Sequence, residues 1–311
     1  MRSILVVAGV TAAGKTAAAI ELARRFDGEL VGADSVQVYR GFDIGSAKPA
    51  PAELGGLQHH LLDVVDPDEP IDAADYARRA DDAIATISSK GKLPIVVGGT
   101  GLWLRALLRG LVELPPPDPD LRARLEAEAA ALDPEALHAR LAAIDPALAP
   151  RLHPRDKVRI VRALEVHAQT GRPLGELQRE HALGAPRYRA FVAVLDRPRA
   201  ELHDAIRARI ASMLASGWVE ETRGLLERWG PDVRPMGAVG YREIKDHLQL
   251  GVPLEETARL AYKSTRTYAR RQRTWMRGHH REAWHTTAAE LTSGASRIEA
   301  FLEAAGRDDS G

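Results

Sequence analysis

A glycine-rich segment near the start of the sequence has the residue types and spacing of a phosphate-binding loop. It matches the pattern G-x-x-x-x-G-K-[ST] and directly follows an apolar run, Ile4 to Ala8, that predicts a buried strand. Backbone N–H groups of such a loop point at phosphate oxygens, Lys15 reaches the terminal phosphate, and the Thr16 hydroxyl can bind Mg²⁺. The loop residues are Gly9, Val10, Thr11, Ala12, Ala13, Gly14, Lys15 and Thr16.

This loop alone predicts a ligand with a diphosphate or triphosphate group, such as ATP, and Mg²⁺ as a cofactor. Kinases, nucleotide hydrolases and some transferases share the motif, so the loop does not select the reaction. A structural alternative is that the glycines only permit a tight turn from strand to helix.

Further polar residues follow other predicted strands. Asp34 ends the run Glu29 to Ala33, Thr100 lies in the glycine-rich turn after Leu93 to Val97, and a third strand is predicted from Phe191 to Leu195. Strands that alternate with helical segments predict a parallel sheet, whose carboxyl edge binds ligands. Asp34 is therefore a candidate base, with the alternative that its carboxylate only caps the next turn.

The fold class predicted is α/β, a P-loop NTPase-like parallel sheet flanked by helices, with a smaller all-helical insertion. Pro115 to Pro117 break the chain, and Asp-Pro pairs at Asp118, Asp133 and Asp145 each predict a helix start. We expect residues 112–188 to form the insertion and residues 1–111 and 189–311 to form the core. The alanine-, serine- and glycine-rich segment from about Thr286 is expected to fray.

The composition of the 311 residues is that of an ordinary globular protein, with 43 basic and 43 acidic side chains. The absence of cysteine excludes disulfides and thiol catalysis and favours a cytoplasmic location. No apolar run approaches the roughly 18 residues needed to span a bilayer, so no membrane partner is predicted. The basic charge is concentrated between Lys263 and Arg281, which we expect to contact phosphates of a nucleic acid.

Seven segments, in order along nearly the whole chain, resemble the bacterial tRNA dimethylallyltransferase family. The second of them, a long stretch after the second predicted strand, is far more specific than the phosphate-binding loop. The segments are Gly9 to Thr16, Gly32 to Pro49, His59 to Asp63, Gly98 to Ala106, Arg162 to Val166, Val239 to Glu243 and Thr267 to Trp275.

The resemblance implies transfer of a dimethylallyl group from dimethylallyl diphosphate to N6 of adenosine 37, beside the anticodon of tRNA. The tRNAs would be those reading codons that begin with U, and the products N6-dimethylallyladenosine and diphosphate. It implies that Asp34 accepts the proton of the amine and that a monomer acts. Thr100, in its glycine-rich turn, is a candidate to orient the amine or a phosphate oxygen; the alternative is that the glycines only shape the turn. Arg209 is a candidate second phosphate cation; a solvated helix arginine is the alternative.

For tRNA, the resemblance points to three segments and to single residues beside them. For any one arginine among them, a solvated helix face is the alternative. The family more often has glutamine or arginine where Gly237 stands. The implied contacts are Asp34, Ser35, Val36, Gln37, Thr100, Arg122, Val158, Arg159, Ile160, Val161, Arg162, Gly237, Ala238, Val239, Gly240, Tyr241 and Arg242.

Two other functions compete with this interpretation. A small-molecule kinase would need ATP, an acceptor hydroxyl and a magnesium carboxylate such as Asp63 or Asp66. A nucleic-acid-binding switch would hydrolyse a nucleotide when RNA binds. His59 and His60 also suggest a metal site, but neighbouring strand residues point to opposite faces, so a shared metal is not expected.

Overall fold

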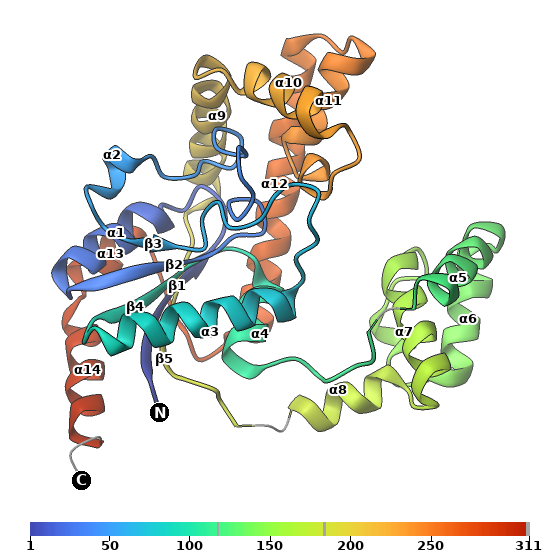
Figure 1. Cartoon of the computed structure of the whole chain (residues 1–311), viewed down its shortest axis with the longest axis horizontal. Coiled ribbons are helices and arrows are strands. Elements are labelled where there is room, and N and C mark those ends of the chain that lie inside the picture. The colour runs from blue at the N-terminus through green and yellow to red at the C-terminus, as the bar shows by residue number, and fades with distance from the viewer. Residues whose placement is uncertain (117, 183–184, 309–311) are drawn as a thin grey trace. The chain divides into compact units, whose positions relative to one another are not determined.

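The computed structural model describes residues 1–116, 118–182 and 185–308, and Pro117 of the predicted proline break lies outside these ranges. Within them, six parallel strands form one sheet in the order β3-β2-β4-β1-β5-β6 (Figure 1). The P-loop strand is central, which confirms the predicted α/β class. The strands are β1 (Ser3–Gly9), β2 (Gly28–Ala33), β3 (His59–His60), β4 (Leu93–Gly98), β5 (Arg189–Leu195) and β6 (Trp284–Thr286).

Helices cover both faces of the sheet. The chain moves from β1 outward to β2 and then returns through β4 to β5, so right-handed crossovers place the connecting helices on opposite faces. Figure 1 shows α3 (Ala73–Ser89) in front of the sheet and α1 (Lys15–Arg25) behind it. Because both faces are covered, β1 and β2 are buried along almost their whole length and can be apolar throughout.

Aromatic stacking joins α3 to α4 (Gly101–Arg109), the helix that follows β4. The rings of Tyr76 and Trp103 lie 4.4 Å apart at an interplanar angle of 15°, and both side chains are buried. This contact holds the start of α4, and with it the glycine-rich turn after β4, at the edge of the sheet.

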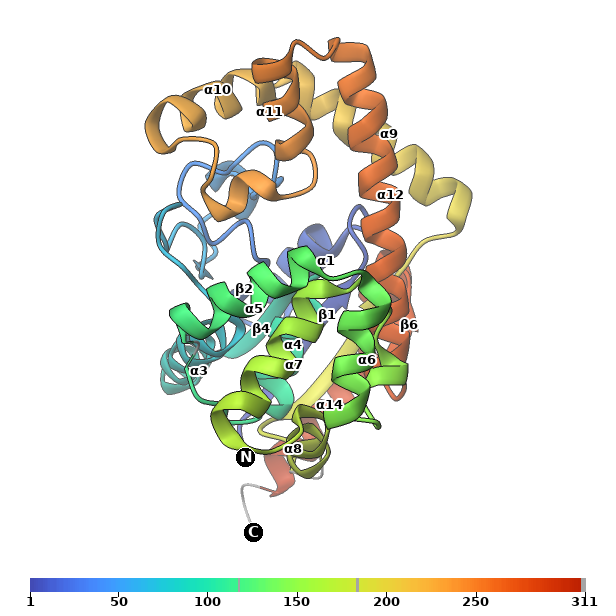
Figure 2. The same cartoon turned by 90° about the vertical axis from the view of Figure 1, so that its right-hand side faces the viewer.

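A group of helices between β5 and β6 extends beyond the carboxyl edge of the sheet. α9 and α12 are its long members and pack against each other (Figure 2). The helices are α9 (Arg199–Ala215), α10 (Trp218–Trp229), α11 (Tyr241–Leu250) and α12 (Leu254–His279). A short α2 (Pro51–Leu54) and the 3₁₀ helix η2 (Arg234–Gly237) complete this side.

The described part of the segment after Thr286, to residue 308, is mostly helical, which corrects our prediction that the segment frays. It forms α13 (Ala288–Ser293) and α14 (Ser296–Asp308), and Leu291 and Ile298 are fully buried. α13 packs against α1. The small residues that suggested disorder instead allow these short helices to pack closely, and a few apolar residues among them provide the burial.

Residues 109–186 form a second compact unit, and residues 1–108 and 187–311 form the first. Its helices surround a hydrophobic core of their own, and α7 packs against both α5 and α6 (Figure 2). The helices are α5 (Pro119–Ala131), α6 (Pro134–Ile144), the 3₁₀ helix η1 (Ala149–Arg151), α7 (Lys157–Thr170) and α8 (Leu174–Ala182).

Two of the three Asp-Pro pairs start helices as predicted, and the third does not. Asp118 and Asp133 accept hydrogen bonds from backbone N–H groups at the starts of α5 and α6. Asp145 instead follows the end of α6 and is buried. Its carboxylate accepts bonds from the N–H groups of Leu148 (3.0 Å) and Gly175 (2.7 Å), so it joins the end of α6 to the start of α8.

We predict that Asp145→Ala destabilises this helical unit by about 3 kcal/mol, because two buried N–H donors lose a charged acceptor. Denaturant unfolding followed by circular dichroism measures the change. Asp118→Ala, which removes an exposed helix cap, should cost only about 1 kcal/mol. Equal losses from the two variants would contradict the importance assigned to the buried carboxylate.

Candidate functional site

The P-loop turn requires glycine at its first position. Gly9 has a φ of +143°, and a Cβ there would lie 2.1 Å from the carbonyl oxygen of Leu195 on the neighbouring strand. The Val10 N–H then donates to this same carbonyl at 3.2 Å. The loop can therefore leave β1 only by lying directly against the end of β5.

The loop ends at the uncapped N-terminus of α1. Gly14, with a φ of +86°, precedes Lys15, and no side chain accepts from the first N–H groups of the helix. These donors and the helix dipole make this end a site for an anion. The Lys15 ammonium meanwhile donates to the Val10 carbonyl at 2.8 Å.

Besides Arg24, three cationic side chains line a cavity of about 780 Å³ beside this helix end, and the carboxylates of Glu21 and Glu53 also line it. Burial lowers the pKa of Lys15, Asp34 opposes the shift and the Arg209 charge adds to it, so that the pKa is about 8. Burial likewise lowers the pKa of Arg209, again opposed by Asp34, and its guanidinium donates to the Ser46 carbonyl at 3.2 Å. The third is Arg197, which the sequence analysis did not identify.

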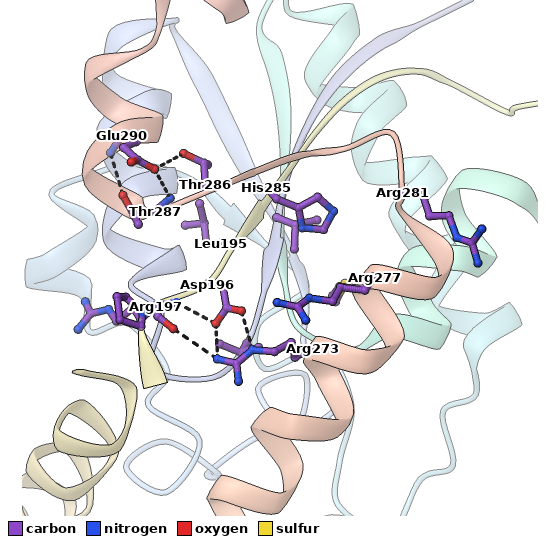
Figure 3. Close-up of a pocket in the computed structure, with 14 residues that line it drawn as sticks. Leu195, Asp196, Arg197, Arg273, Arg277, Arg281, His285, Thr286, Thr287 and Glu290 are labelled. Atoms are coloured by element: carbon purple, nitrogen blue, oxygen red, sulfur yellow. Dashed lines mark hydrogen bonds and ion pairs between the residues drawn. The ribbon is translucent and has the colours of Figure 1, made fainter. Parts of the chain in front are cut away.

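Arg197 projects from the loop between β5 and α9 and reaches the P-loop. A Cβ added to Gly14 would lie 3.4 Å from its terminal nitrogen. The preceding residue, Asp196, forms a bidentate ion pair that holds the backbone of Arg197 in place. Arg273 donates to both of its carboxylate oxygens, at 2.6 and 2.7 Å. Figure 3 shows this pair in a second cavity, of about 520 Å³, which also contains Val10 of the P-loop.

Asp34 and Thr100 lie at the ends of the adjacent strands β2 and β4. The Thr100 N–H donates to the Ala33 carbonyl at 3.2 Å, and its hydroxyl accepts from the Ser35 N–H at 3.1 Å. One carboxylate oxygen of Asp34, Oδ1, accepts from the N–H groups of Val36 (2.9 Å) and Gln37 (3.4 Å). The turn-capping role is thus present, and it uses a single carboxylate oxygen.

Gln272 on α12 connects the P-loop to the turn after β4. Its Oε1 accepts from the Thr11 N–H at 2.8 Å, and its Nε2 donates to the Gly99 carbonyl at 3.0 Å. The side chain is buried, and Gly99 must lack a Cβ to accommodate it. The sequence signal for Gln272 is its place in the family-like segment Thr267 to Trp275, for which only phosphate contacts of the basic residues are predicted.

Tyr268, one turn before Gln272 on the same helix, completes the cluster. Burial raises the pKa of its hydroxyl, and the Asp34 charge raises it further, while interactions with Gln272 and Thr100 oppose the shift. The phenol is therefore neutral at physiological pH and can donate a hydrogen bond.

The segment after Asp34 is held in place by its own side chains. The Gln37 amide donates to the carbonyls of Ser46 (3.1 Å) and Ala47 (3.0 Å), while Ser35, Val36 and Gln37 are all half-buried. Glu221 on α10 accepts from three successive N–H groups of the same loop, those of residues 43 to 45. Glu221 was not singled out from the sequence.

The predicted tRNA segment Gly237 to Arg242 has a mixed environment. Tyr241 is fully buried and donates its hydroxyl hydrogen to Glu221, and Gly240 packs against the ring of Trp218. Their side-chain positions therefore serve packing. Ala238 and Val239 are half-buried, Arg242 pairs with Glu243, and Gly237 is exposed with open space around it.

The predicted tRNA residues of the second unit lie together along α5 and α7. Arg122 and Arg162 both donate to the buried Oε2 of Glu165, at 2.7 and 2.6 Å. Val158 is 82% exposed, and Arg159 is exposed as well. Ile160 and Val161 are buried, so their side chains belong to the core of this unit.

Metal-binding side chains do not cluster in the part of the chain that the structure describes. The Nε2 atom of His60 forms a hydrogen bond with Oε2 of Glu29 at 2.8 Å, and burial lowers the pKa of His59 to about 4. Asp63 pairs with Lys48, and Asp66 pairs with Arg40. Among the described helices, none combines the length and apolar character needed to cross a membrane.

Comparison with known proteins gives a consistent result. A family model described as IPP transferase matches residues 37–279. A tRNA dimethylallyltransferase of Anaeromyxobacter dehalogenans is 53% identical over 295 residues, covering 95% of this chain and 96% of that relative. One of Sorangium cellulosum is 51% identical over 274 residues, covering 88% of this chain and 87% of the other.

Solved structures agree. A tRNA isopentenylpyrophosphate transferase of Bacillus halodurans matches with a TM-score of 0.73 and 33% identity, covering 100% of this chain and 99% of the other. A eukaryotic dimethylallyltransferase solved acting on tRNA matches with a TM-score of 0.82 and 26% identity, covering 96% of this chain and 78% of the other.

We predict that binding of inorganic diphosphate weakens as the pH rises through about 8, the pKa of Lys15. The anion favours the ammonium form, so affinity is full below this pKa and falls up to tenfold per pH unit above it. Calorimetric titration from pH 7 to pH 9.5 measures it. In Lys15→Arg, whose guanidinium stays charged, this component of the pH dependence should disappear; an identical profile would contradict the assignment to Lys15.

We also predict that Gly237→Gln tightens tRNA binding about twofold to tenfold, the value of one added hydrogen bond. The space around Gly237 is open, so the side chain needs no rearrangement. Fluorescence anisotropy with unmodified tRNA gives the dissociation constants. Gly224→Gln, at another open glycine, is the matched control. Equal affinities for both variants and the wild type would argue against RNA contacts at this position.

Proposed function

The chain belongs to the IPP transferase family, and from this premise we propose that it transfers a dimethylallyl group to tRNA. The donor is dimethylallyl diphosphate, and the acceptor is N6 of adenosine 37 in tRNAs that read codons beginning with U. The products are N6-dimethylallyladenosine and diphosphate.

The observation that carries the proposal is the cavity at the start of α1. It combines the loop N–H groups with Lys15, Arg197 and Arg209, and it lies at the same sheet edge as Asp34 and Thr100. A departing diphosphate develops concentrated negative charge, and fixed donors and cations stabilise that charge in the transition state. The buried cations repel one another without an anion, which is consistent with the lowered pKa of Lys15.

The reaction breaks the bond between C1 and the diphosphate oxygen, and the diphosphate leaves with the bonding electrons. N6 of the adenine forms the new bond to C1 and loses one proton. Asp34 accepts this proton in the proposal, since Oδ1 is held by backbone N–H groups and Oδ2 stays available. The Thr100 hydroxyl, fixed by Ser35, orients the amine or a phosphate oxygen.

Mg²⁺ fits this cavity as a partner of the diphosphate. The Thr16 hydroxyl is a suitable oxygen ligand, and Mg²⁺ in such sites is held mainly by phosphate oxygens and water, so no carboxylate cluster is needed. When bound, it would neutralise part of the charge on the leaving group.

The target adenine must leave the stack of the anticodon loop to reach C1. We propose that the segments Asp34 to Gln37 and Gly237 to Arg242 of the core contact the extruded loop. In the helical unit, we assign the contacts to Arg122 and to the residues from Val158 to Arg162. We further propose that the chain acts as a monomer in the cytoplasm.

The kinase interpretation is less well supported. The carboxylates that it would use for magnesium, Asp63 and Asp66, are neutralised by Lys48 and Arg40. The acidic group at the sheet edge beside the P-loop is instead Asp34, which suits a base for an amine.

We expect Asp34→Asn to lower the rate of transfer from labelled dimethylallyl diphosphate to unmodified tRNA by about 10² to 10⁴, the value of a general base. Asparagine keeps an oxygen that can cap the same turn, so the variant separates the base from the cap. Asp34→Ala removes both.

An incubation with ATP in place of the prenyl donor is the control for the competing functions. Transfer by the wild type without ATP supports the proposal. Transfer that persists in Asp34→Asn would keep the reaction and exclude Asp34 as its base. ATP consumption without any transfer would favour a kinase or switch.

A further inference from the structure

One face of α12 carries a regular stripe of cations. They recur at alternating spacings of four and three residues, so they share one side of the helix, with neighbours about 5–6 Å apart. The stripe consists of Arg259, Lys263, Arg266, Arg270 and Arg273. Like charges at these spacings repel and weaken a helix, so the arrangement is not explained by helix stability.

α9 packs beside this stripe and encloses a groove of about 700 Å³, which we call the α9–α12 groove. α9 adds Arg199 and His203 to its walls, and Leu202 and Ile206 form its apolar floor. No acidic side chain lines the groove in the described part of the chain. Across the whole sequence basic and acidic residues are equal in number, so this surface is a local concentration of positive charge.

Nearby acids neutralise only the margins of the groove. Glu256 pairs with Arg259, and Asp196 pairs with Arg273. Among the described residues, Arg199, Lys263, Arg266 and Arg270 have no salt bridge. The middle of the stripe therefore has no direct ion pair, although the Glu256 carboxylate also attracts Lys263.

Tyr262 organises this middle part. Its ring lies 5.0 Å from the guanidinium of Arg207 and 5.3 Å from that of Arg266, and it meets the ring of His203 edge-on at 6.3 Å. The Tyr262 hydroxyl and the Nε of Arg266 are buried and have no hydrogen-bond partner among the described residues. The Tyr262 ring thus orients the Arg266 guanidinium in the wall of the groove.

His203 does not add charge of its own at neutral pH. Burial lowers its pKa, and Arg266, Arg199 and Arg207 lower it further, while Asp204 opposes them. Of the arginines that depress this pKa, Arg199 and Arg266 line the groove and contribute to its positive potential, whereas Arg207 pairs with Asp204.

We propose that the α9–α12 groove binds the phosphodiester backbone of the tRNA substrate, outside the three segments that contact the anticodon loop. A row of cations at five helical positions fits a chain of phosphates better than a single small anion, and the three in the middle have no salt bridge among the described residues. This inference rests on the proposed function for the choice of RNA over other polyanions, and it assigns no role in the chemical step.

The test uses the double variant Lys263→Gln/Arg270→Gln, which removes two unpaired charges from the stripe. Anisotropy titrations with unmodified tRNA, repeated between 50 and 200 mM salt, give affinity and its salt dependence. We expect binding at least tenfold weaker and a salt slope smaller by about 1.5, the value for two lost phosphate contacts. KM for tRNA should rise, while kcat at saturating tRNA stays unchanged.

The double variant Arg78→Gln/Arg79→Gln on α3 is the matched control, with two charges removed from another helix, and it should bind tRNA like the wild type. Binding of inorganic diphosphate should be unchanged in both variants, which reports an intact core. Because the stripe residues repel one another, the groove variant should unfold at the same or a higher temperature than the wild type.

The outcomes separate the two proposals. If the wild type modifies tRNA and the groove variant has an unchanged tRNA affinity and salt slope, the groove does not bind RNA. The proposed function is then unaffected. A loss of kcat without a rise in KM also overturns the groove as an RNA surface. If the wild type neither binds nor modifies tRNA, the proposed function is wrong, and so is the choice of RNA as the ligand of the groove.

Discussion

The contact of backbone with backbone at the carboxyl edge of the sheet is the constraint on which the site depends. Gly9 would place a Cβ 2.1 Å from the carbonyl of Leu195, and Gly98 would place one 2.1 Å from the carbonyl of Ala33. Neither position can hold a side chain. As a result, the ends of β1, β2, β4 and β5 meet without intervening side chains, and the residues that follow them enter one small space.

α12 contributes uncharged side chains to this space. Gln272 bonds to the P-loop and to the turn after β4, and Tyr268 lies beside Asp34 and Thr100. Among the arginines of the same helix, Arg273 pairs with Asp196, and Arg259, Arg266 and Arg270 line the α9–α12 groove. One helix therefore gives a neutral surface to the reacting groups and a charged surface to its flank.

The sequence was sufficient for four strands of the sheet, β1, β2, β4 and β5, and for the residues at their carboxyl ends, but it did not predict β6. Continuous apolar runs predict buried parallel strands, and the ends of such strands converge, so Lys15, Asp34 and Thr100 could be grouped beforehand. Gln272 could not, because its bonds link residues 261 and 173 positions apart. Asp145 was assigned wrongly for a similar reason: its N–H donor on Gly175 is 30 residues away, and a local pattern cannot reveal it.

The helical unit leaves and rejoins the core at one point. Residue 108 ends one part of the core and residue 187 begins the other, and the N–H of Arg187 donates to the carbonyl of Leu108 at 3.1 Å. This hydrogen bond connects the two parts of the core on either side of the insertion. The hydrophobic core of the helical unit is formed by residues of that unit alone. Such an arrangement is modular: the inserted segment can lengthen, shorten or be exchanged over generations without altering the register of a single strand.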